Sequence, residues 1–219
     1  MRVELEVTLR CTSRCPACSR HCNFLEQPDS DMSAEQLGAF YASVQSRTSA
    51  LGVVSVLGGE PMLHPEIGRI SRELHRLRAA GKILRLQLIT NGVLDHTDVQ
   101  GLYDRVVVSR PAAKSHRCQL MAPADTGQQR RSCRVPHTCG VAVSAYGCYP
   151  CGAGGAIARL FWDGRYRMGG LPAAVEDFGD LEPLCSLCQR SARVPLLVRD
   201  HGSPRSKSFR KALRRRGVA

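Results

Sequence analysis

Hydrophobic and polar residues alternate strictly at the start of the chain. The apolar positions are Val3, Leu5, Val7 and Leu9, and the polar positions between them are Glu4, Glu6 and Thr8. A period of two is typical of a β-strand with one buried face, so we predict a strand over Val3–Arg10. Its acidic face has two alternatives: it lines the hollow side of a curved sheet, or it is exposed on an edge strand.

Strand and helix signals then alternate as far as residue 110. Ser33 and Gln36 have the spacing of a capping box, and Pro65 and Gly81 suit the first and last positions of a second helix. The predicted elements are a helix over Ser33–Ser46, a strand over Val53–Leu57, a helix over Pro65–Ala80, a strand over Leu84–Thr90, a short helix over Asp95–Leu102 and a strand over Arg105–Ser109.

These βα-type units, repeated along the first half, predict a parallel sheet with right-handed crossovers. A closed barrel needs about eight units, and this chain has the length for about half of them. The expected fold class is therefore α/β: a partial, incomplete TIM-type βα barrel followed by a small α+β domain.

Beyond residue 110, cysteine, proline and glycine dominate the sequence. Val141–Tyr146 and Ile157–Trp162 have the apolar character of short strands, with Asp163-Gly164 as a hairpin turn. A segment this small and rich in glycine is not expected to be stable by burial alone, which favours a bound metal. We therefore expect a partial-barrel domain over residues 1–120, an auxiliary metal domain over residues 121–200 and a basic tail over residues 201–219.

Composition narrows the class of protein. The chain has 219 residues, eleven cysteines and a net charge of +12. No apolar run approaches the ~20 residues of a membrane span, and the charged N-terminus is unlike a signal peptide. Thiols at this density in a reducing compartment usually bind metal, so we expect a cytoplasmic metalloprotein.

The positive charge is unevenly distributed. Seven of the lysines and arginines fall in the last fifteen residues. Such a run is either a solvated tail or a contact for an anionic partner, such as a phosphorylated substrate, a nucleotide or nucleic acid.

Three cysteines follow the first predicted strand. Cys11, Cys15 and Cys18 have the spacing C-x3-C-x2-C and lie at the carboxyl end of the strand, where βα enzymes place their chemistry. Structural zinc sites close four ligands, so three thiolates are an unusual set for zinc. Three cysteines on a four-iron cluster would instead leave one iron open to another ligand.

A glycine turn follows the second predicted strand. Its residues are Gly58, Gly59, Glu60 and Pro61. Two glycines let the backbone approach a ligand closely, and the Glu60 carboxylate with nearby carbonyl groups can accept hydrogen bonds from an ammonium group. Alone this sequence is simply a tight turn, but it is expected beside the cysteines on the neighbouring strand end.

The cysteine spacing and the Gly-Gly-Glu-Pro turn together resemble the radical S-adenosylmethionine superfamily, over residues 3–110. The resemblance implies that Cys11, Cys15 and Cys18 hold a [4Fe–4S] cluster and that S-adenosylmethionine chelates the open iron through its amino and carboxylate groups. The Gly-Gly-Glu segment would contact the amino group.

Two further positions fit this resemblance, and one departs from it. Asn91, in the sequence Thr90-Asn91-Gly92, and Ser109 follow the third and fourth predicted strands and are expected to contact S-adenosylmethionine. Ala17 stands where the family usually has an aromatic residue against the adenine, so this departure concerns the packing of adenine and not the cluster.

A second set of cysteines is similar to the auxiliary-cluster domains of the superfamily, known as SPASM and twitch domains. The resemblance implies a second [4Fe–4S] cluster on Cys151, Cys185 and Cys188, with Cys133 or Cys139 as the fourth ligand. The alternative is a zinc ribbon, because Cys148 and Cys151 form a C-x2-C pair that matches the later one.

Family resemblance also implies a reaction. An electron donor such as flavodoxin or ferredoxin would reduce the first cluster, and cleavage of S-adenosylmethionine would give a 5′-deoxyadenosyl radical that takes a hydrogen atom from carbon. We expect a small polyhydroxylated substrate of specialised metabolism, such as a sugar, an aminocyclitol or a nucleoside. The positive net charge of the chain favours an anionic form of this substrate. The expected reaction is epimerisation or dehydrogenation. Cys118 and Cys148 are candidate hydrogen-atom donors and favour epimerisation.

Two alternatives stay open at this point. One is a radical enzyme that matures peptides. The other is a zinc-stapled, basic nucleic-acid-binding protein, which leaves the third cysteine of the first set and the Gly-Gly-Glu turn without a role.

Overall fold

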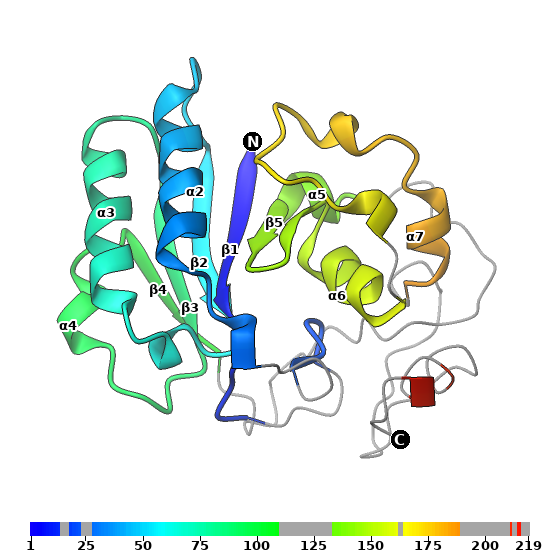
Figure 1. Ribbon diagram of the computed structural model, residues 1–219. Coiled ribbons are helices and arrows are strands. Elements are labelled where there is room, and N and C mark those ends of the chain that lie inside the picture. Colours follow the sequence, from blue (N-terminus) through cyan, green and yellow to red (C-terminus); the bar gives the residue numbers. More distant parts are fainter. Residues whose placement is uncertain are drawn as a thin grey trace.

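The computed structural model describes residues 1–13, 18–22, 28–109, 133–161, 164–188, 211, 214 and 215. Its centre is one six-stranded sheet of order β4-β3-β2-β1-β5-β6 (Figure 1). The strands are β1 (Arg2–Thr8), β2 (Val53–Gly58), β3 (Leu86–Thr90), β4 (Arg105–Val108), β5 (Val141–Ser144) and β6 (Gly147–Tyr149). All neighbouring pairs are parallel except β5 with β6. Within the described residues the sheet stays open, which confirms the predicted partial barrel.

Helices cover both faces of this sheet. The helical elements are η1 (Pro28–Ser30), α2 (Ala34–Ser46), η2 (Pro61–Leu63), α3 (Ile67–Ala79), α4 (Thr97–Gln100), α5 (Val135–Thr138), α6 (Gly152–Phe161), η3 (Gly164–Tyr166), η4 (Val175–Phe178) and α7 (Glu182–Ser186). The predicted capping box is present, since Ser33 Oγ accepts from Gln36 N–H and Gln36 Oε1 accepts from Ser33 N–H.

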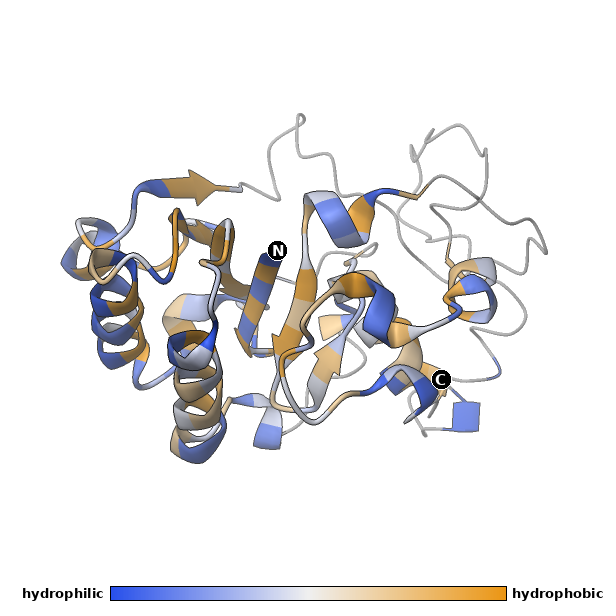
Figure 2. Cartoon of the chain, turned by 90° about the horizontal axis from the view of Figure 1, so that it is seen from above, coloured by the Kyte–Doolittle hydropathy of each residue, from blue (hydrophilic) through white to orange (hydrophobic). Residues whose placement is uncertain are grey.

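The main core lies between the outer face of the sheet and the helices α2 and α3. Val3, Leu5 and Val7 of β1 are fully buried there, as the alternation predicts. From α3 the side chains of Ile70 and Leu74 reach the same core. Figure 2 shows strands of mostly hydrophobic colour and an α3 that carries both hydrophobic and hydrophilic residues.

The polar face of β1 lines the inner side of the sheet. Because β1 lies between β2 and β5, the edge-strand alternative is wrong. Glu4 pairs in register with Ser55 and Ala142, and Ala142 packs against α6 on this inner face. The acidic residues of β1 are therefore buried between the sheet and the second half of the chain.

One predicted strand is wrong. Ile157–Trp162 does not continue as a strand, because residues 152–161 form helix α6. All its residues from Gly152 to Leu160 are buried. Arg159 is the one polar side chain in Ile157–Phe161, so the run has no polar face from which to read a period, and the pattern could not distinguish a buried helix from a strand.

The sheet continues across the predicted domain boundary. Strand β5 pairs with β1 from Val3↔Val141 to Glu6↔Ser144, although about 135 residues of chain separate them. Gly140 makes this possible: its φ is +118°, and a Cβ there would overlap the carbonyl oxygen of Arg2. The boundary near residue 120 itself lies outside the described residues.

None of the described helices is long and apolar enough to cross a bilayer.

The packing predicts a clear contrast between two leucines. Leu88 in β3 is fully buried, whereas Leu84, which precedes the strand, is 67% exposed. We expect Leu88→Ala to lower the free energy of unfolding by about 3 kcal/mol because it leaves a cavity in the core. Leu84→Ala should change it by less than about 0.5 kcal/mol. Urea titration of both variants measures this, and equal losses would contradict the described core.

Candidate radical chemistry site

The loops that follow β1, β2 and β3 meet at the carboxyl edge of the sheet. The N–H of Gly59 donates to the carbonyl of Thr8 at 2.8 Å, and the N–H of Glu60 donates to the carbonyl of Arg10 at 2.7 Å. The glycine turn after β2 therefore lies directly against the chain that leads into Cys11. This is the juxtaposition that the sequence predicts.

The two glycines of this turn are required by that close approach. A Cβ at Gly58 would overlap the carbonyl oxygen of Thr8, and one at Gly59 would overlap the carbonyl oxygen of Arg10. Gly58 also has a φ of +156°. The sequence predicts that these glycines contact a ligand, and within the described residues their closest contact is with the neighbouring loop.

Glu60 is the central residue of this edge. It is fully buried, and Pro61 after it begins η2. Its Oε1 accepts from Met62 N–H at 3.1 Å and from Thr90 Oγ1 at 2.7 Å, and its Oε2 accepts from Asn91 N–H at 2.8 Å. Since each carboxylate oxygen accepts about two hydrogen bonds, Oε2 keeps capacity for one more donor, such as a ligand ammonium group.

Asn91 extends this contact to the cysteine loop. Its Nδ2 donates to Thr12 Oγ1 at 2.9 Å and to Ser13 Oγ at 3.3 Å, and lies 3.9 Å from Cys11 Sγ. Ser109 continues along the same edge, because its N–H donates to the carbonyl of Thr90 at 2.7 Å. Cys11, Glu60 and Asn91, predicted from separate motifs, are thus brought together.

An ion pair that the sequence analysis missed fixes the start of the cysteine loop. Arg10 pairs with Asp31 at 2.7 Å and also donates to the carbonyl of Leu63. Asp31 accepts in addition from Thr8 Oγ1. No local pattern marks this pair, because its partners are far apart in the sequence and meet only through the fold.

The described part of the cysteine loop holds its thiols close to one another. Cys15 lies outside the described residues. A hydrogen bond from the Cys22 thiol lowers the pKa of Cys18, and the same bond raises the pKa of Cys22, which the nearby Cys11 raises further. A thiol whose pKa is lowered is readily deprotonated, as a metal ligand must be. Cys22, outside the predicted set, is buried beside these thiols.

The thiols of the second set also influence one another's pKa. Burial and then Cys133, Cys188 and Asp180 raise the pKa of Cys185 to about 11. Burial is also the main cause that raises the pKa of Cys151, with Cys188 and Cys133 among the further causes. Cys133 is thus one of the thiols whose charge acts on both Cys151 and Cys185.

The remaining candidate cysteines lie elsewhere. Cys139 ends α5, next to Gly140 at the amino end of β1. Cys148 is 2% exposed and packs in the main core, where burial raises its pKa to about 11. That position suits the inert, structural role of most buried cysteines. Cys118 lies outside the described residues.

Residues 5–108 match the family model of the radical SAM superfamily. The chain contains a radical SAM domain. A search of curated proteins found no match. Among solved structures, the chain is similar to BtrN in complex with AdoMet and 2-DOIA, with a TM-score of 0.59, 15% identity and coverage of 92% of this chain and 96% of BtrN. It is also similar to selenomethionine BtrN in an open conformation, with a TM-score of 0.53, 14% identity and coverage of 91% and 92%.

At this identity the BtrN structures show the fold alone, and they extend the similarity beyond the radical SAM domain into the second half of the chain. A radical SAM domain implies a [4Fe–4S] cluster and S-adenosylmethionine. The described thiols and the carboxyl-edge acceptors fit both groups in their chemistry. In the described ranges, no three Cys, His, Asp or Glu side chains form a group that could hold a metal ion.

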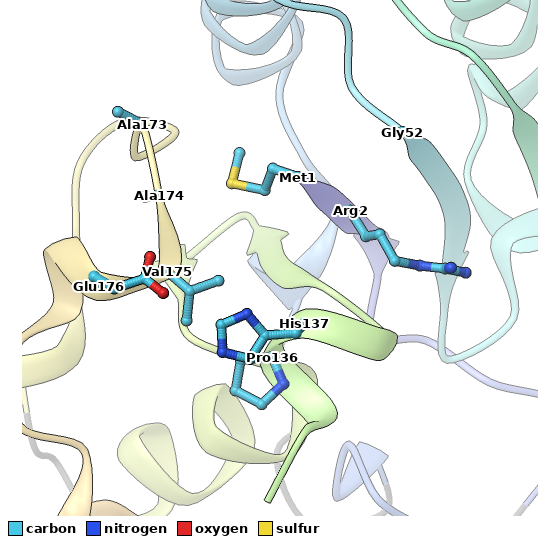
Figure 3. A pocket seen from close by; sticks show the side chains of 9 residues that line it. All are labelled: Met1, Arg2, Gly52, Pro136, His137, Ala173, Ala174, Val175 and Glu176. Carbon is cyan, nitrogen blue, oxygen red and sulfur yellow. The ribbon is translucent and has the colours of Figure 1, made fainter.

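A cavity of about 350 Å³ lies at the opposite end of the sheet (Figure 3). Met1 and Arg2 line it at the start of β1, together with Pro136, His137 and residues 173–176. It is separated from the Gly-Gly-Glu turn by the length of β1, roughly 20 Å for seven residues. We therefore leave it outside the candidate radical SAM site.

The buried Glu60 carboxylate generates a stability prediction. Glu60→Gln replaces one acceptor oxygen with an NH₂ group that faces N–H or O–H donors, so we expect the free energy of unfolding to fall by about 2 kcal/mol. Glu66→Gln is the matched control, since the side chain of Glu66 is 47% exposed and forms a surface ion pair with Arg69; its effect should stay below about 0.5 kcal/mol. Chemical denaturation measures both, and a Glu60→Gln variant as stable as the control would contradict the assigned contacts.

Proposed function

We propose that this chain is a radical SAM enzyme with two clusters that oxidises a small polyhydroxylated substrate. Cys11, Cys15 and Cys18 would hold the first [4Fe–4S] cluster, and Cys133, Cys151, Cys185 and Cys188 the second. The observation that carries the proposal is the convergence of Cys11, Glu60 and Asn91 at the carboxyl edge of the radical SAM domain. Ligands of open α/β sheets bind outside this edge.

The residues of this edge have distinct roles in the proposal. When bound, the first cluster and S-adenosylmethionine supply an adenosyl radical that removes a hydrogen atom from carbon. Glu60 and the backbone of Gly58 and Gly59 would accept hydrogen bonds from the amino group, and Asn91 and Ser109 would contact the rest of the molecule. Arg10 and Asp31 keep the cysteine loop in place.

The second set of cysteines favours dehydrogenation as the outcome. A carbinol carbon that has lost a hydrogen atom becomes a ketone when it also loses one electron and the hydroxyl proton. A second cluster would accept the electron, and a base or water the proton. Epimerisation instead needs a hydrogen-atom donor at the substrate, and the buried position of Cys148 in the core makes it unsuited to that role.

The proposed substrate class is supported by a structural relative and by the charge of the chain. A structural relative was solved with the small molecule 2-DOIA bound. The similarity covers almost the whole of both chains. This supports a small molecule rather than a peptide, and the basic balance of the chain favours one with negative charge.

One experiment tests the ligand sets through a matched pair of cysteines. After anaerobic reconstitution, we expect Cys133→Ala to lose about half of the bound iron while it retains cleavage of S-adenosylmethionine. Cys139→Ala should keep the full iron content, because the charge of Cys133, and not that of Cys139, is named among those that act on Cys151 and Cys185. Iron and sulfide analysis with detection of 5′-deoxyadenosine gives the readout.

The first set supplies the control. The triple variant Cys11→Ala, Cys15→Ala and Cys18→Ala should keep the other half of the iron and lose all cleavage. Retained cleavage in the triple variant would overturn the first site. Iron that depends on Cys139 rather than Cys133 would overturn the second.

A further inference from the structure

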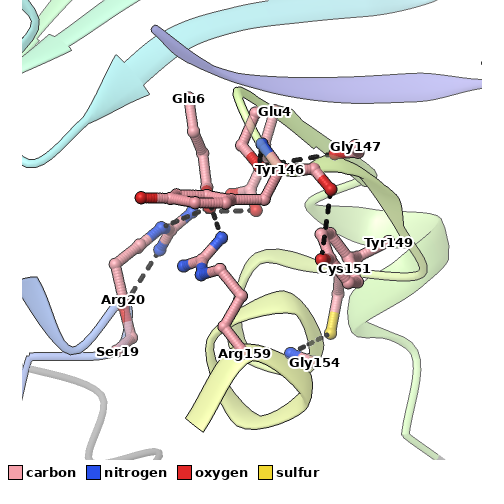
Figure 4. A network of polar contacts seen from close by, with 11 residues as sticks. Glu4, Glu6, Ser19, Arg20, Tyr146, Gly147, Tyr149, Cys151, Gly154 and Arg159 are labelled. Atoms are coloured by element: carbon pink, nitrogen blue, oxygen red, sulfur yellow. Dashed lines mark hydrogen bonds and ion pairs between the residues drawn. The ribbon is translucent and has the colours of Figure 1, made fainter. Parts of the chain in front are cut away.

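A buried network of ion pairs joins the cysteine loop to the second half of the chain (Figure 4). Arg20 Nη2 lies 2.8 Å from Glu4 Oε2, and Arg20 Nε lies 3.2 Å from Glu6 Oε1. Arg159 of α6 reaches Glu6 from the other side, with 3.6 Å between Nη1 and Oε2. Three segments distant in the sequence therefore meet on the inner face of β1.

The network is shielded from solvent. The side chains of Arg20, Glu6 and Arg159 are 16%, 0% and 6% exposed. The guanidinium group of Arg159 also lies over the rings of Tyr146 and Tyr149, at 5.4 and 6.0 Å from their centroids. Charges in such surroundings act over longer distances than surface charges, because water and salt screen them less.

Both cysteine sets touch this network. Arg20 is two residues from Cys18, and Gly152 directly follows Cys151. A Cβ at Gly152 would lie only 2.8 Å from Arg20 Nη2 and from Glu6 Oε1, so the backbone after Cys151 rests against the ion pair. Sequence position and packing thus place Arg20 between the two sets.

The charges also reach the thiols. Besides the hydrogen bond from Cys22, the guanidinium charge of Arg20 lowers the pKa of Cys18. On the other side, burial raises the pKa of Cys151 and the carboxylate of Glu4 adds to that effect. Arg20 and Glu4 therefore act on the thiols with opposite sign.

We propose that Arg20 is a positioning residue that holds the two cysteine sets against each other and whose charge raises the reduction potential of the clusters. This inference rests on the proposed function, since it concerns the clusters that the two sets would bind. Net charge around an iron–sulfur cluster is one of the factors that set its potential, and a nearby positive charge stabilises the reduced form. A buried guanidinium group beside Cys18 fulfils that condition.

Arg20→Gln tests the charge. In the anaerobically reconstituted full-length protein, we expect the midpoint potential of the first cluster to become more negative, measured by redox titration monitored by electron paramagnetic resonance. Arg20→Lys, which keeps the charge, should restore most of the shift. Arg78→Gln is the matched control, because Arg78 pairs with Asp104 on the surface away from the cysteines, and it should leave the potential unchanged.

The variant Glu4→Gln should shift the midpoint potentials in the opposite direction. It removes a negative charge from the same network, so we expect the potentials to become more positive. This variant decides the question alone if Arg20→Gln does not fold or bind iron. Shifts of the same sign in Arg20→Gln and Glu4→Gln, or an Arg20→Lys variant as low as Arg20→Gln, would show a structural role only and overturn the inference. Failure of the unmodified protein to bind iron would instead overturn the proposed function.

Discussion

The candidate site depends on one buried carboxylate. Glu60 accepts hydrogen bonds from Met62, Thr90 and Asn91, and its own N–H donates to the carbonyl of Arg10. One residue, through its side chain and its backbone N–H, therefore ties the ends of β2 and β3 to the segment that leads into the cysteines. A buried carboxylate is costly unless such donors surround it, so loss of any one contact destabilises the others. The glycines before it are required because only they allow the two loops to approach so closely.

Much of this edge is predictable from the sequence, because it depends on local patterns. Alternation along β1, the capping box at Ser33 and the cysteine spacing each have a local physical cause, and the parallel topology brings the strand ends together. The contacts that fix the site are different. Two sets of ion pairs join residues that no periodicity relates: Arg10 with Asp31, and Arg20 with Glu4 and Glu6. The helix α6 is buried on all sides, so its sequence shows no amphipathic period that would predict a helix. The preference that we propose for Cys133 over Cys139 likewise depends on the surroundings of Cys151 and Cys185 in the fold.

The second half of the chain shares the sheet of the radical SAM domain. Strand β5 pairs directly with β1, and α6 packs on the inner face above the acidic residues of β1. The network of Arg20, Glu4, Glu6 and Arg159 then fills the space between the two cysteine sets. Two clusters held in this way would sit in one continuous packed structure, which suits the transfer of an electron from a substrate radical to the second cluster.

The most direct test of this account is the metal content of the unmodified chain. Protein purified without oxygen should contain about eight irons and eight acid-labile sulfides per chain, as expected for two [4Fe–4S] clusters. Zinc in place of iron at both cysteine sets would contradict the account and favour the alternative of a zinc-stapled, nucleic-acid-binding protein. About four irons with one zinc would keep the radical SAM site and contradict the second cluster as electron acceptor.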